Sequence, residues 1–342
     1  MSYQPLYRIS PGLLNQLTRA TELRQWIANA TLDVPWLPAL QKDTAARLAH
    51  SSTAIEGNLL SLIEVKSLAQ GDSVSAQDKF KKEVLDYLKA LRWIEKQPAG
   101  SSITETKLFF LHRLITEHTL PSKESGRYKT RPNRIVDGRG RTVYVPPLPK
   151  MVKKMTRELL DWINKTSEIK IHPLIVSSVA HHRLVSIHPF MDGNGRISRA
   201  LAVWVFYTRG FDSRHLFALD EYFEADRSLY YEKIQQAREL DHDLTGWLEY
   251  TAEGLVDTLE KTRRRIESLQ IRNRDSRLVL NRRQEELLRF IRERGKAGSA
   301  EICREFHLTR SRVNQLVKPL VDAAVLIREG STRATVYKLS AG

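Results

Sequence analysis

The sequence contains one cysteine, Cys303, among 342 residues, so no disulfide can form within the chain. Cys303 lies in an apolar helical pattern, where we expect a small buried side chain, and this cysteine usage is compatible with a reducing, cytoplasmic location. No uncharged apolar run reaches the 18 or so residues of a membrane span, and no apolar signal core follows the N-terminus. With only 16 Gly and 13 Pro, the chain is neither fibrous nor of low complexity.

Negative charge is scarce toward the C-terminus. From Lys261 to Gly342 there are 20 Lys and Arg against 9 Asp and Glu, so most of the net charge of +15 lies in this segment. A basic segment of this kind favours nucleic acid as a partner, whereas the plainer interpretation is a solvated basic face. Charge alone does not separate the two.

Apolar residues recur at helical spacing along most of the chain, and we expect a mainly α fold. In the helix expected over Phe80–Lys96, one face carries Val84, Leu85, Leu88 and Leu91. The other helices expected in the first half cover Leu13–Ala30, Gln41–Thr53, Thr104–Glu117 and Lys150–Lys165.

A helix that begins at Pro173 is expected to stop at Ile187, because His188 precedes a proline and such residues avoid helical geometry. Upstream of it, Arg134–Pro147 has the Asp137-Gly138 turn signal and strand-type residues, which predict a β-hairpin.

The last 60 residues or so have a compact pattern of their own. It predicts a helix that ends at Gly295, a second capped by Ser299, a third capped by Thr309, and two strands around Glu329-Gly330-Ser331. Three helices and a hairpin in this order resemble a winged helix-turn-helix domain.

The chemistry is concentrated in HPFMDGNGRISR, residues 188–199. Gly193 and Gly195 let backbone amides converge at a helix start, predicted near Arg196, and such a nest binds phosphate. Arg196 and Arg199 share a helix face and can both donate to phosphate oxygens. Asp192 is a hard oxygen ligand suited to Mg²⁺, and His188 is suited to act as a general base.

Plainer interpretations exist for each of these side chains. A lone histidine at a helix end is usually structural, and an arginine such as Arg199 usually forms a surface ion pair. His181 and His182 have no further ligands at metal spacing, so we expect them to pack within the core. Phe190 is expected to be buried as an anchor of the loop.

The same twelve residues match the signature of the Fic family, His-x-Phe-x-Asp-Gly-Asn-Gly-Arg-x-x-Arg, at every defining position. The chain therefore resembles a protein adenylyltransferase, which moves AMP from ATP to a Tyr, Thr or Ser hydroxyl of a target protein. The resemblance covers about Glu83–Gly246 and implies Mg²⁺ as the metal. The family's phosphorylating branch has Ala-Asn-Lys-Arg in place of the run from Gly193 to Arg196, so kinase activity is not expected.

The resemblance assigns a role to each residue of the motif. His188 takes the proton of the target hydroxyl, Asp192 holds Mg²⁺, and Tyr231 lies near the adenine. The residues implied in binding the phosphates are Gly193, Asn194, Gly195, Arg196, Ile197, Ser198 and Arg199.

Upstream, SSTAIEGN resembles the inhibitory motif of the Fic class in which an inhibitory helix precedes the core. Its residues here are Ser52, Glu56 and Gly57. A carboxylate can pair with an arginine fork, so Glu56 is expected to occupy Arg199 and exclude the γ-phosphate. The hairpin matches the family's flap, whose residues Val143 and Tyr144 are expected to dock the target segment.

The predicted organisation has four parts: an N-terminal helical region with the inhibitory motif (1–100), the Fic core (101–260), a basic linker helix (261–280) and a winged-helix domain (281–342). Two other activities stay open. One is removal of AMP from a modified protein, with Glu56 orienting water.

The other is DNA binding through the C-terminal domain, by Arg310 and Arg312 at the recognition helix and Arg328 and Arg333 on the wing. Pro319 weakens that interpretation because it should shorten or kink the helix. A second copy of the chain is a further candidate partner.

Overall fold

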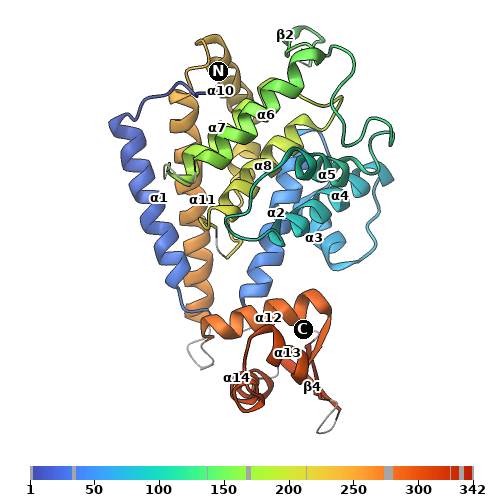
Figure 1. Cartoon of the computed structure of the whole chain (residues 1–342), viewed down its shortest axis with the longest axis vertical. Helices are drawn as coiled ribbons and strands as arrows, with labels where there is room; N and C mark the ends of the chain where they lie inside the picture. The colour runs from blue at the N-terminus through green and yellow to red at the C-terminus, as the bar shows by residue number, and fades with distance from the viewer. Residues whose placement is uncertain are drawn as a thin grey trace. The chain divides into compact units, whose positions relative to one another are not determined.

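The computed structural model describes residues 3–32, 36–136, 138–166, 171–212, 214–272, 280–323, 325–330 and 335–340. The chain divides into two compact units, shown in Figure 1. Unit 1 comprises Met1–Ala28 and Lys42–Thr262, and unit 2 comprises Asn29–Gln41 and Arg263–Gly342.

Up to Arg272 the described chain is helical apart from one hairpin. Its elements are α1 (Pro11–Asn29), α2 (Trp36–Ile55), α3 (Leu62–Gln70), α4 (Asp78–Glu95), α5 (Glu105–Thr116), β1 (Ile135–Val136), β2 (Thr142–Tyr144), α6 (Pro149–Lys165), α7 (Pro173–Ile187), α8 (Asn194–Thr208), α9 (Asp220–Ala225), α10 (Arg227–Glu239) and α11 (Thr245–Arg272). The mainly α prediction is confirmed.

Two helices, α7 and α8, form the core of unit 1 and lie side by side in Figure 1. Both are buried on nearly every face, which is typical of helices at the centre of a domain. Pro173 occupies the first turn of α7, and the helix ends at Ile187, as the sequence predicts. Because α7 and α8 are consecutive, the loop between them, residues 188–193, is held at both ends by the core.

The end of α2 is set by a glycine. Gly57 has a left-handed backbone with φ of 95°, and its amide donates to Ala54 O, which closes the last turn. Asn58 donates through its backbone amide to Thr53 O and turns the chain away from the helix. The segment from Ser52 to Asn58 is therefore a helix end with a fixed exit.

Several local expectations differ from the structure. Leu85 is 44% exposed, while its predicted neighbours on the apolar face are buried. Helix α3, which begins with a capping box from Ser61 to Glu64, is an additional helix that the apolar pattern does not indicate. Helix α8 begins at Asn194, two residues before the predicted start. Each difference is a local one, and none moves the predicted motif.

The hairpin of unit 1 joins β1 and β2 as an antiparallel pair with an irregular register. It lies within the predicted span of Arg134–Pro147, and Asp137 of its turn falls outside the described residues. Val143 is exposed, whereas the Tyr144 ring faces inward and its hydroxyl donates to Ser186 O at 3.0 Å. Tyr144 thus anchors the hairpin to α7.

Unit 2 has its own apolar cluster, built from both helices and strands. Its elements are α12 (Arg282–Arg294), β3 (Lys296–Gly298), α13 (Ser299–Glu305), α14 (Arg310–Asp322), β4 (Leu326–Glu329) and β5 (Val336–Leu339). The strands form an antiparallel sheet in the order β3-β5-β4. The predicted linker helix is described only as far as Arg272, and Arg333 and Ser331 lie outside the described residues.

Details of unit 2 correct the sequence-based expectations. Gly298, not Ser299, is the cap residue of α13, and β3 was not predicted. Cys303 is only partly buried and packs at the edge of the apolar cluster. Pro319 does not shorten α14, which continues to Asp322. Thr309 caps α14 as predicted, since its hydroxyl accepts the amide N–H of Arg312.

Among the described residues, no helix is both long and apolar enough to cross a membrane.

Candidate active site

His188 stands at the junction where α7 ends. Its backbone is left-handed, with φ of 52°, and its amide donates to Leu184 O at 2.9 Å. The ring Nδ1–H donates to Val185 O at 3.3 Å, which leaves Nε2 with its lone pair. Burial lowers the pKa of His188 to about 4, so at neutral pH the imidazole is an unprotonated base.

The loop after His188 is closed by one side chain. Asn194 accepts the amide N–H of Phe190 at 2.9 Å and donates to the carbonyl of the same residue at 2.9 Å. Phe190 is fully buried, as the sequence analysis expects. The Asn194 amide is therefore used inside the loop, and the predicted contact of Asn194 with phosphate stays a prediction.

His112 of α5 contacts this loop through a hydrogen bond and a ring stack. Its Nδ1 accepts the amide N–H of Gly126 at 2.9 Å, so Nε2 carries the hydrogen and donates to Asp192 O at 3.0 Å. The ring stacks on Phe190, with centroids 3.8 Å apart and planes at 10°. Burial lowers the pKa of His112 to about 4, which keeps the ring neutral and this hydrogen-bond pattern fixed.

Lys129 holds the other side of the loop. Its backbone amide donates to Pro189 O at 2.9 Å, and its ammonium donates to Asn133 Oδ1 at 2.6 Å. Asn133 in turn donates to Phe190 O at 3.2 Å. Burial lowers the pKa of Lys129 to about 8, and its charge is one of those that lower the pKa of His188.

Helix α8 starts at Asn194, directly after the loop that follows His188. Gly193 has φ of 75°, and a Cβ there would stand 2.9 Å from Thr116 Cγ2, so only glycine fits. The N-terminus of a helix is an anion site, because its first N–H groups have no partner within the helix.

Arg196 is buried in this site without full satisfaction of its donors. Only 4% of it is exposed, yet neither Nε nor Nη1 has a hydrogen-bond partner among the described residues. Its ionic neighbours are distant: Glu83 Oε1 lies 3.6 Å from Nη1, and Asp192 Oδ2 lies 3.8 Å from Nη2. Buried donors of this kind are costly unless a ligand satisfies them.

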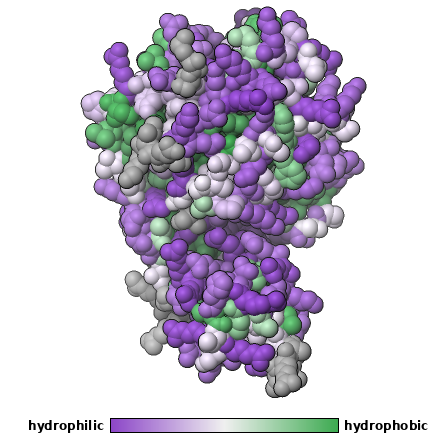
Figure 2. Space-filling view, viewed as in Figure 1, coloured by the Kyte–Doolittle hydropathy of each residue, from purple (hydrophilic) through white to green (hydrophobic). Residues whose placement is uncertain are grey.

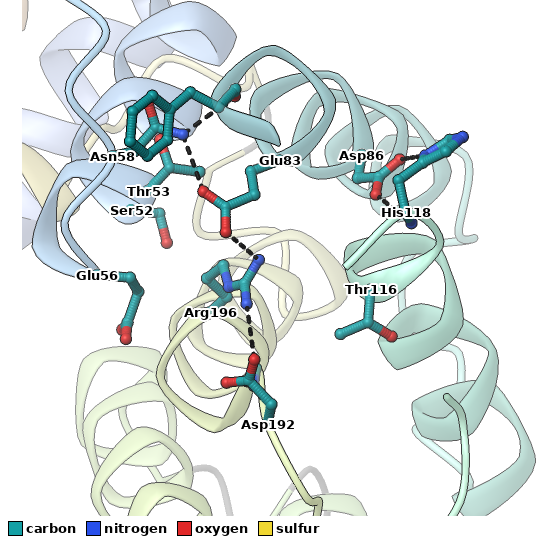
Figure 3. Close-up of polar contacts among 12 residues, drawn as sticks. Ser52, Thr53, Glu56, Asn58, Glu83, Asp86, Thr116, His118, Asp192 and Arg196 are labelled. Carbon is teal, nitrogen blue, oxygen red and sulfur yellow. Dashed lines mark hydrogen bonds and ion pairs between the residues drawn. The ribbon is translucent and has the colours of Figure 1, made fainter. Parts of the chain in front are cut away.

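Figure 3 shows how Arg196 is linked to the end of α2. Glu83 of α4 points toward Arg196 with one oxygen and, with the other, accepts from Asn58 Nδ2 at 2.9 Å. Asn58 also donates to Phe80 O at 3.0 Å. The residue that follows Gly57 is thereby tied to the carboxylate that faces Arg196.

Arg199 lies one turn further along α8 and is fully buried. Its Nε donates to Ser52 Oγ and its Nη2 to Ser52 O, both at 2.8 Å. Nη1 donates to Tyr230 OH at 3.3 Å, and Asp220 Oδ2 lies 4.0 Å from Nε. Burial raises the pKa of Asp220 to about 6, although the nearby guanidinium opposes this.

Glu56 is a further hydrogen-bond partner of Arg199, and its Oε1 lies 2.7 Å from Nη2. The same oxygen lies over the start of α8, because a Cβ added at Gly195 would stand 2.1 Å from it. The carboxylate of Glu56 thus occupies the place above Gly195 where an anion would meet the helix. Ser52 and Glu56 both contact Arg199, and Gly57 directly follows Glu56 at the end of α2.

Two side chains of α10 donate hydrogen bonds to the backbone at the end of α2. Arg227 Nη2 donates to Ile55 O at 2.6 Å, and Tyr231 OH donates to the same carbonyl at 3.2 Å. Tyr231 remains 48% exposed, so part of its ring is open to a ligand. Its predicted place near the adenine stays a prediction.

Asp192 is the residue at this site that could hold a metal. Its side chain is 62% exposed, and its Oδ1 accepts the amide N–H of Gly193 at 2.6 Å. One accessible carboxylate beside an anion site suits Mg²⁺, which binds to few protein oxygens together with phosphates and water. The donor chemistry of Asp192 therefore fits the predicted metal.

Other predicted residues have structural tasks. The Ser198 hydroxyl donates to Asn194 O at 2.7 Å, the Ile197 side chain is fully buried and its amide donates to Gly193 O, so the predicted contact of both residues with phosphate stays a prediction. His181 and His182 are buried in the core of unit 1, where each ring bonds one neighbour, Tyr230 OH or Ile234 O.

Outside the motif, the described residues hold one group with metal-ligand spacing: Asp86, Glu117 and His118. The Asp86 carboxylate accepts from the amide and from the ring Nδ1 of His118, at 3.0 and 2.7 Å. The Glu117 carboxylate pairs with Lys89. These contacts explain why the three side chains lie close together at the end of α5.

The sequence analysis missed four supporting residues, namely Glu83, His112, Lys129 and Asp220. Each is polar or charged in a segment with apolar helical spacing or next to a loop, so the only signal in the sequence was a polar residue in an apolar setting. Three of the four contact the motif itself across at least 60 positions of sequence: Glu83 with Arg196, His112 with Asp192, and Lys129 with Pro189. No local pattern indicates such pairs.

Comparison with known proteins agrees with this geometry. Residues 102–206 match the model of the Fic/DOC family. This part of the chain is therefore similar to Fic/DOC domains. The matched range runs from the start of α5 to near the end of α8 and contains the whole motif, while Ser52 and Glu56 lie upstream of it.

Two curated relatives are both named as protein adenylyltransferases. Protein adenylyltransferase Fic from Nematostella vectensis is 31% identical over 217 residues, which are 61% of this chain and 46% of that protein. Protein adenylyltransferase fic-1 from Caenorhabditis elegans is 28% identical over 180 residues, 51% of this chain and 34% of that protein. The chain spans less than half the length of these relatives.

Solved structures share the fold. A Fic family protein from Desulfovibrio desulfuricans G20 has a TM-score of 0.68 at 23% identity and covers 99% of both chains. The structure of Fic-1 residues 134–508 from C. elegans has a TM-score of 0.61 at 24% identity and covers 75% of this chain and 73% of that one. At these identities the likeness concerns the fold.

Proposed function

We propose that the protein is an adenylyltransferase that moves AMP from ATP to a hydroxyl side chain of a target protein. The observation that carries the proposal is the buried guanidinium of Arg196 in the first turn of α8, whose Nε and Nη1 have no hydrogen-bond partner among the described residues. A phosphate chain supplies the acceptors that these donors lack. The match to the Fic/DOC family and the names of the two relatives support the same reaction.

In the proposed reaction, the phosphates lie over Gly193–Gly195 and meet the arginines of α8. His188 directly precedes the loop that leads into α8, and its Nε2 is unprotonated. Nε2 takes the proton of the target hydroxyl, the hydroxyl oxygen bonds to the α-phosphorus, and the bond from that phosphorus to the leaving pyrophosphate breaks. This is catalysis by positioning and charge stabilisation.

Asp192 would hold Mg²⁺, which neutralises phosphate charge when bound. The flap contributes an anchored Tyr144 and an exposed Val143. In the proposal, the target segment lies along the flap backbone so that its hydroxyl faces His188. Two further statements stay predictions from the sequence, namely that the chain forms a homodimer and that its target is a protein.

We further propose that the described arrangement is the inhibited one. The Glu56 carboxylate bonds to Arg199 and lies within 2.1 Å of where a Cβ of Gly195 would stand, so it takes the place of a phosphate oxygen. ATP can then bind productively only when Glu56 leaves. This inhibitory role rests on geometry within unit 1 alone.

The decisive test uses ATP labelled on either the α- or the γ-phosphate, with the full chain as Glu56→Gly and a target lysate. Label from the α-phosphate that reaches protein, and disappears in Glu56→Gly with His188→Ala, supports the proposal. Protein label from the γ-phosphate would indicate kinase chemistry and contradict it.

Removal of AMP from a modified protein is the second candidate. It is favoured by the exposure of Glu56, whose side chain is still 34% accessible while it bonds to Arg199 and could therefore orient a water molecule. The test is incubation of an AMP-modified target with wild type and Glu56→Gly. Release of AMP by wild type alone supports removal, and equal release by both variants contradicts a role for Glu56.

A further inference from the structure

The surface of unit 2 has a face that the adenylyltransferase proposal leaves unused. Unit 2 carries most of the net positive charge of the chain, and the part of it visible in Figure 2 is largely hydrophilic with small apolar spots. Its elements follow the order α12, β3, α13, α14, β4, β5, with β5 between β3 and β4. A strand after the first helix and a terminal hairpin give the wing geometry.

We propose that unit 2 is a winged helix-turn-helix module that binds duplex DNA, with α14 as the helix that enters the major groove. Helices α13 and α14 are consecutive and joined by residues 306–309, the connection length of a helix-turn-helix. In that motif the second helix reads the groove with residues near its N-terminus.

Helix α14 has two distinct faces. Val313, Val317 and Leu320 are buried in the apolar cluster of unit 2. The opposite face is exposed from the first turn onward and carries Arg310, Ser311, Asn314, Gln315 and Lys318. Positions spaced by one, four, five and eight residues lie on one side of a helix, so these side chains form a single surface.

The chemistry of this surface matches base edges and phosphates. Arginine can donate two bonds to guanine, and asparagine or glutamine can pair with adenine, whereas lysine suits phosphate. No Asp or Glu occurs in α14 before Asp322, near its end. This absence of acidic residues over three turns favours a negatively charged partner over a protein surface of mixed charge.

Three cations of α14 and β4 have no ion-pair partner among the described residues. Within the described part of unit 2, no ion pair is formed by Arg310, Lys318 or Arg328, although Arg282, Arg294 and Lys338 each pair with a glutamate. Arg312 donates to Gln315 Oε1 at 3.0 Å and so holds one candidate base-reading side chain in place. Cations without an ion-pair partner among the described residues, together with the fixed Gln315 amide, favour a nucleic acid whose base edges can accept and donate hydrogen bonds.

The test uses the full-length chain and a fluorescent duplex of about 30 base pairs, titrated at several salt concentrations. Non-specific binding is expected with a dissociation constant of about 1–100 μM at physiological salt, and the logarithm of affinity should fall with the logarithm of salt. The variant Arg310→Glu with Lys318→Glu should lose at least tenfold in affinity and show a smaller salt slope.

The matched control is Arg282→Glu with Arg283→Glu, which makes the same change in net charge on the exposed start of α12. It should bind within about threefold of wild type, and thermal melting should show all variants folded. Equal losses in both double variants would mean that only net charge matters and would overturn the assignment of α14.

Base reading is tested by selecting duplexes from a random library with the wild-type chain. Asn314→Ala with Gln315→Ala should abolish preference for the selected sequence while leaving the salt slope unchanged. If the wild-type chain shows no salt-dependent duplex binding even at about 50 mM salt, the proposal is overturned, and unit 2 is a protein-docking module instead.

Discussion

Replacement of Glu56 by glycine should raise AMP transfer, and the gain should depend on Arg199. The contact to be broken joins Glu56 Oε1 and Arg199 Nη2 at 2.7 Å, between a fully buried guanidinium and a carboxylate that is 34% exposed. A charge-assisted hydrogen bond contributes about 1.5–3 kcal/mol, and partial exposure favours the lower end. A loss of about 1.5–2 kcal/mol corresponds to a gain of about 10- to 30-fold in productive ATP binding.

The dependence on Arg199 follows from its other contacts. Ser52 bonds the guanidinium twice, so Arg199 stays in place when Glu56 is removed and is free to meet a phosphate. Removal of Arg199 as well deletes the group that was freed. Arg199→Lys is the companion variant, because it keeps a cation beside Asp220 if Arg199→Ala fails to fold.

The assay is the initial rate of transfer from α-labelled ATP to protein, together with ATP affinity by calorimetry. Glu56→Gln serves as the isosteric control and should change the rate in the same direction as Glu56→Gly. The reasoning is refuted if Glu56→Gly leaves the rate unchanged or lowers it. It is equally refuted if the double variant with Arg199→Ala remains as active as Glu56→Gly alone.

Three further predictions concern the motif, each measured in the Glu56→Gly background. His188→Ala should reduce transfer at least 100-fold while ATP affinity changes less than threefold, and transfer within tenfold of the parent would remove His188 from the base role. Asp192→Ala should abolish the dependence of nucleotide affinity on Mg²⁺; calorimetry that gives unchanged Mg·ATP affinity would contradict this. Gly195→Ala should be inactive in this background, because its methyl group fills the space over the start of α8 that the Glu56 carboxylate occupies in the wild type and where phosphate is proposed to bind; transfer at the rate of the parent would show that phosphate does not bind there.

Much of this site could be predicted because it follows from short-range rules. A proline after His188 ends α7, two glycines shape the loop, and a three-residue spacing brings the two arginines to one face of α8. The segment Ser52–Gly57 was singled out only by its resemblance to a family's inhibitory motif, and the structure adds that Gly57 ends α2 with a left-handed backbone. The partners of Glu56 across the chain were expected only through resemblance to a family, not from the spacing itself.

The residues that support the loop could not be predicted, because their roles depend on packing between distant segments. His112 is a polar residue on a helix of apolar pattern until Phe190 and Asp192 are brought against it. Leu85 shows the reverse error. Its spacing matched the apolar face of α4, yet the burial of that face depends on which neighbours cover it, and Leu85 remains 44% exposed.

Lys129 provides a last prediction, about the proton affinity of His188. Burial is the main cause that lowers the pKa of His188 to about 4, and the charge of Lys129 lowers it further, ahead of that of Arg238. Lys129→Met removes that charge, so the pKa of His188 should rise but stay below its ordinary value near 6.5, while Lys129→Arg should leave it close to 4.

The measurement is an NMR titration of the imidazole resonance that disappears in His188→Ala. Because the folded-state pKa is depressed, the wild-type ring should remain neutral down to about pH 5 and become protonated near pH 4. A wild-type midpoint near 6.5 would contradict the burial argument. A midpoint that moves down in Lys129→Met, or moves equally in Lys129→Arg, would show that the lysine acts through loop geometry and not through its charge.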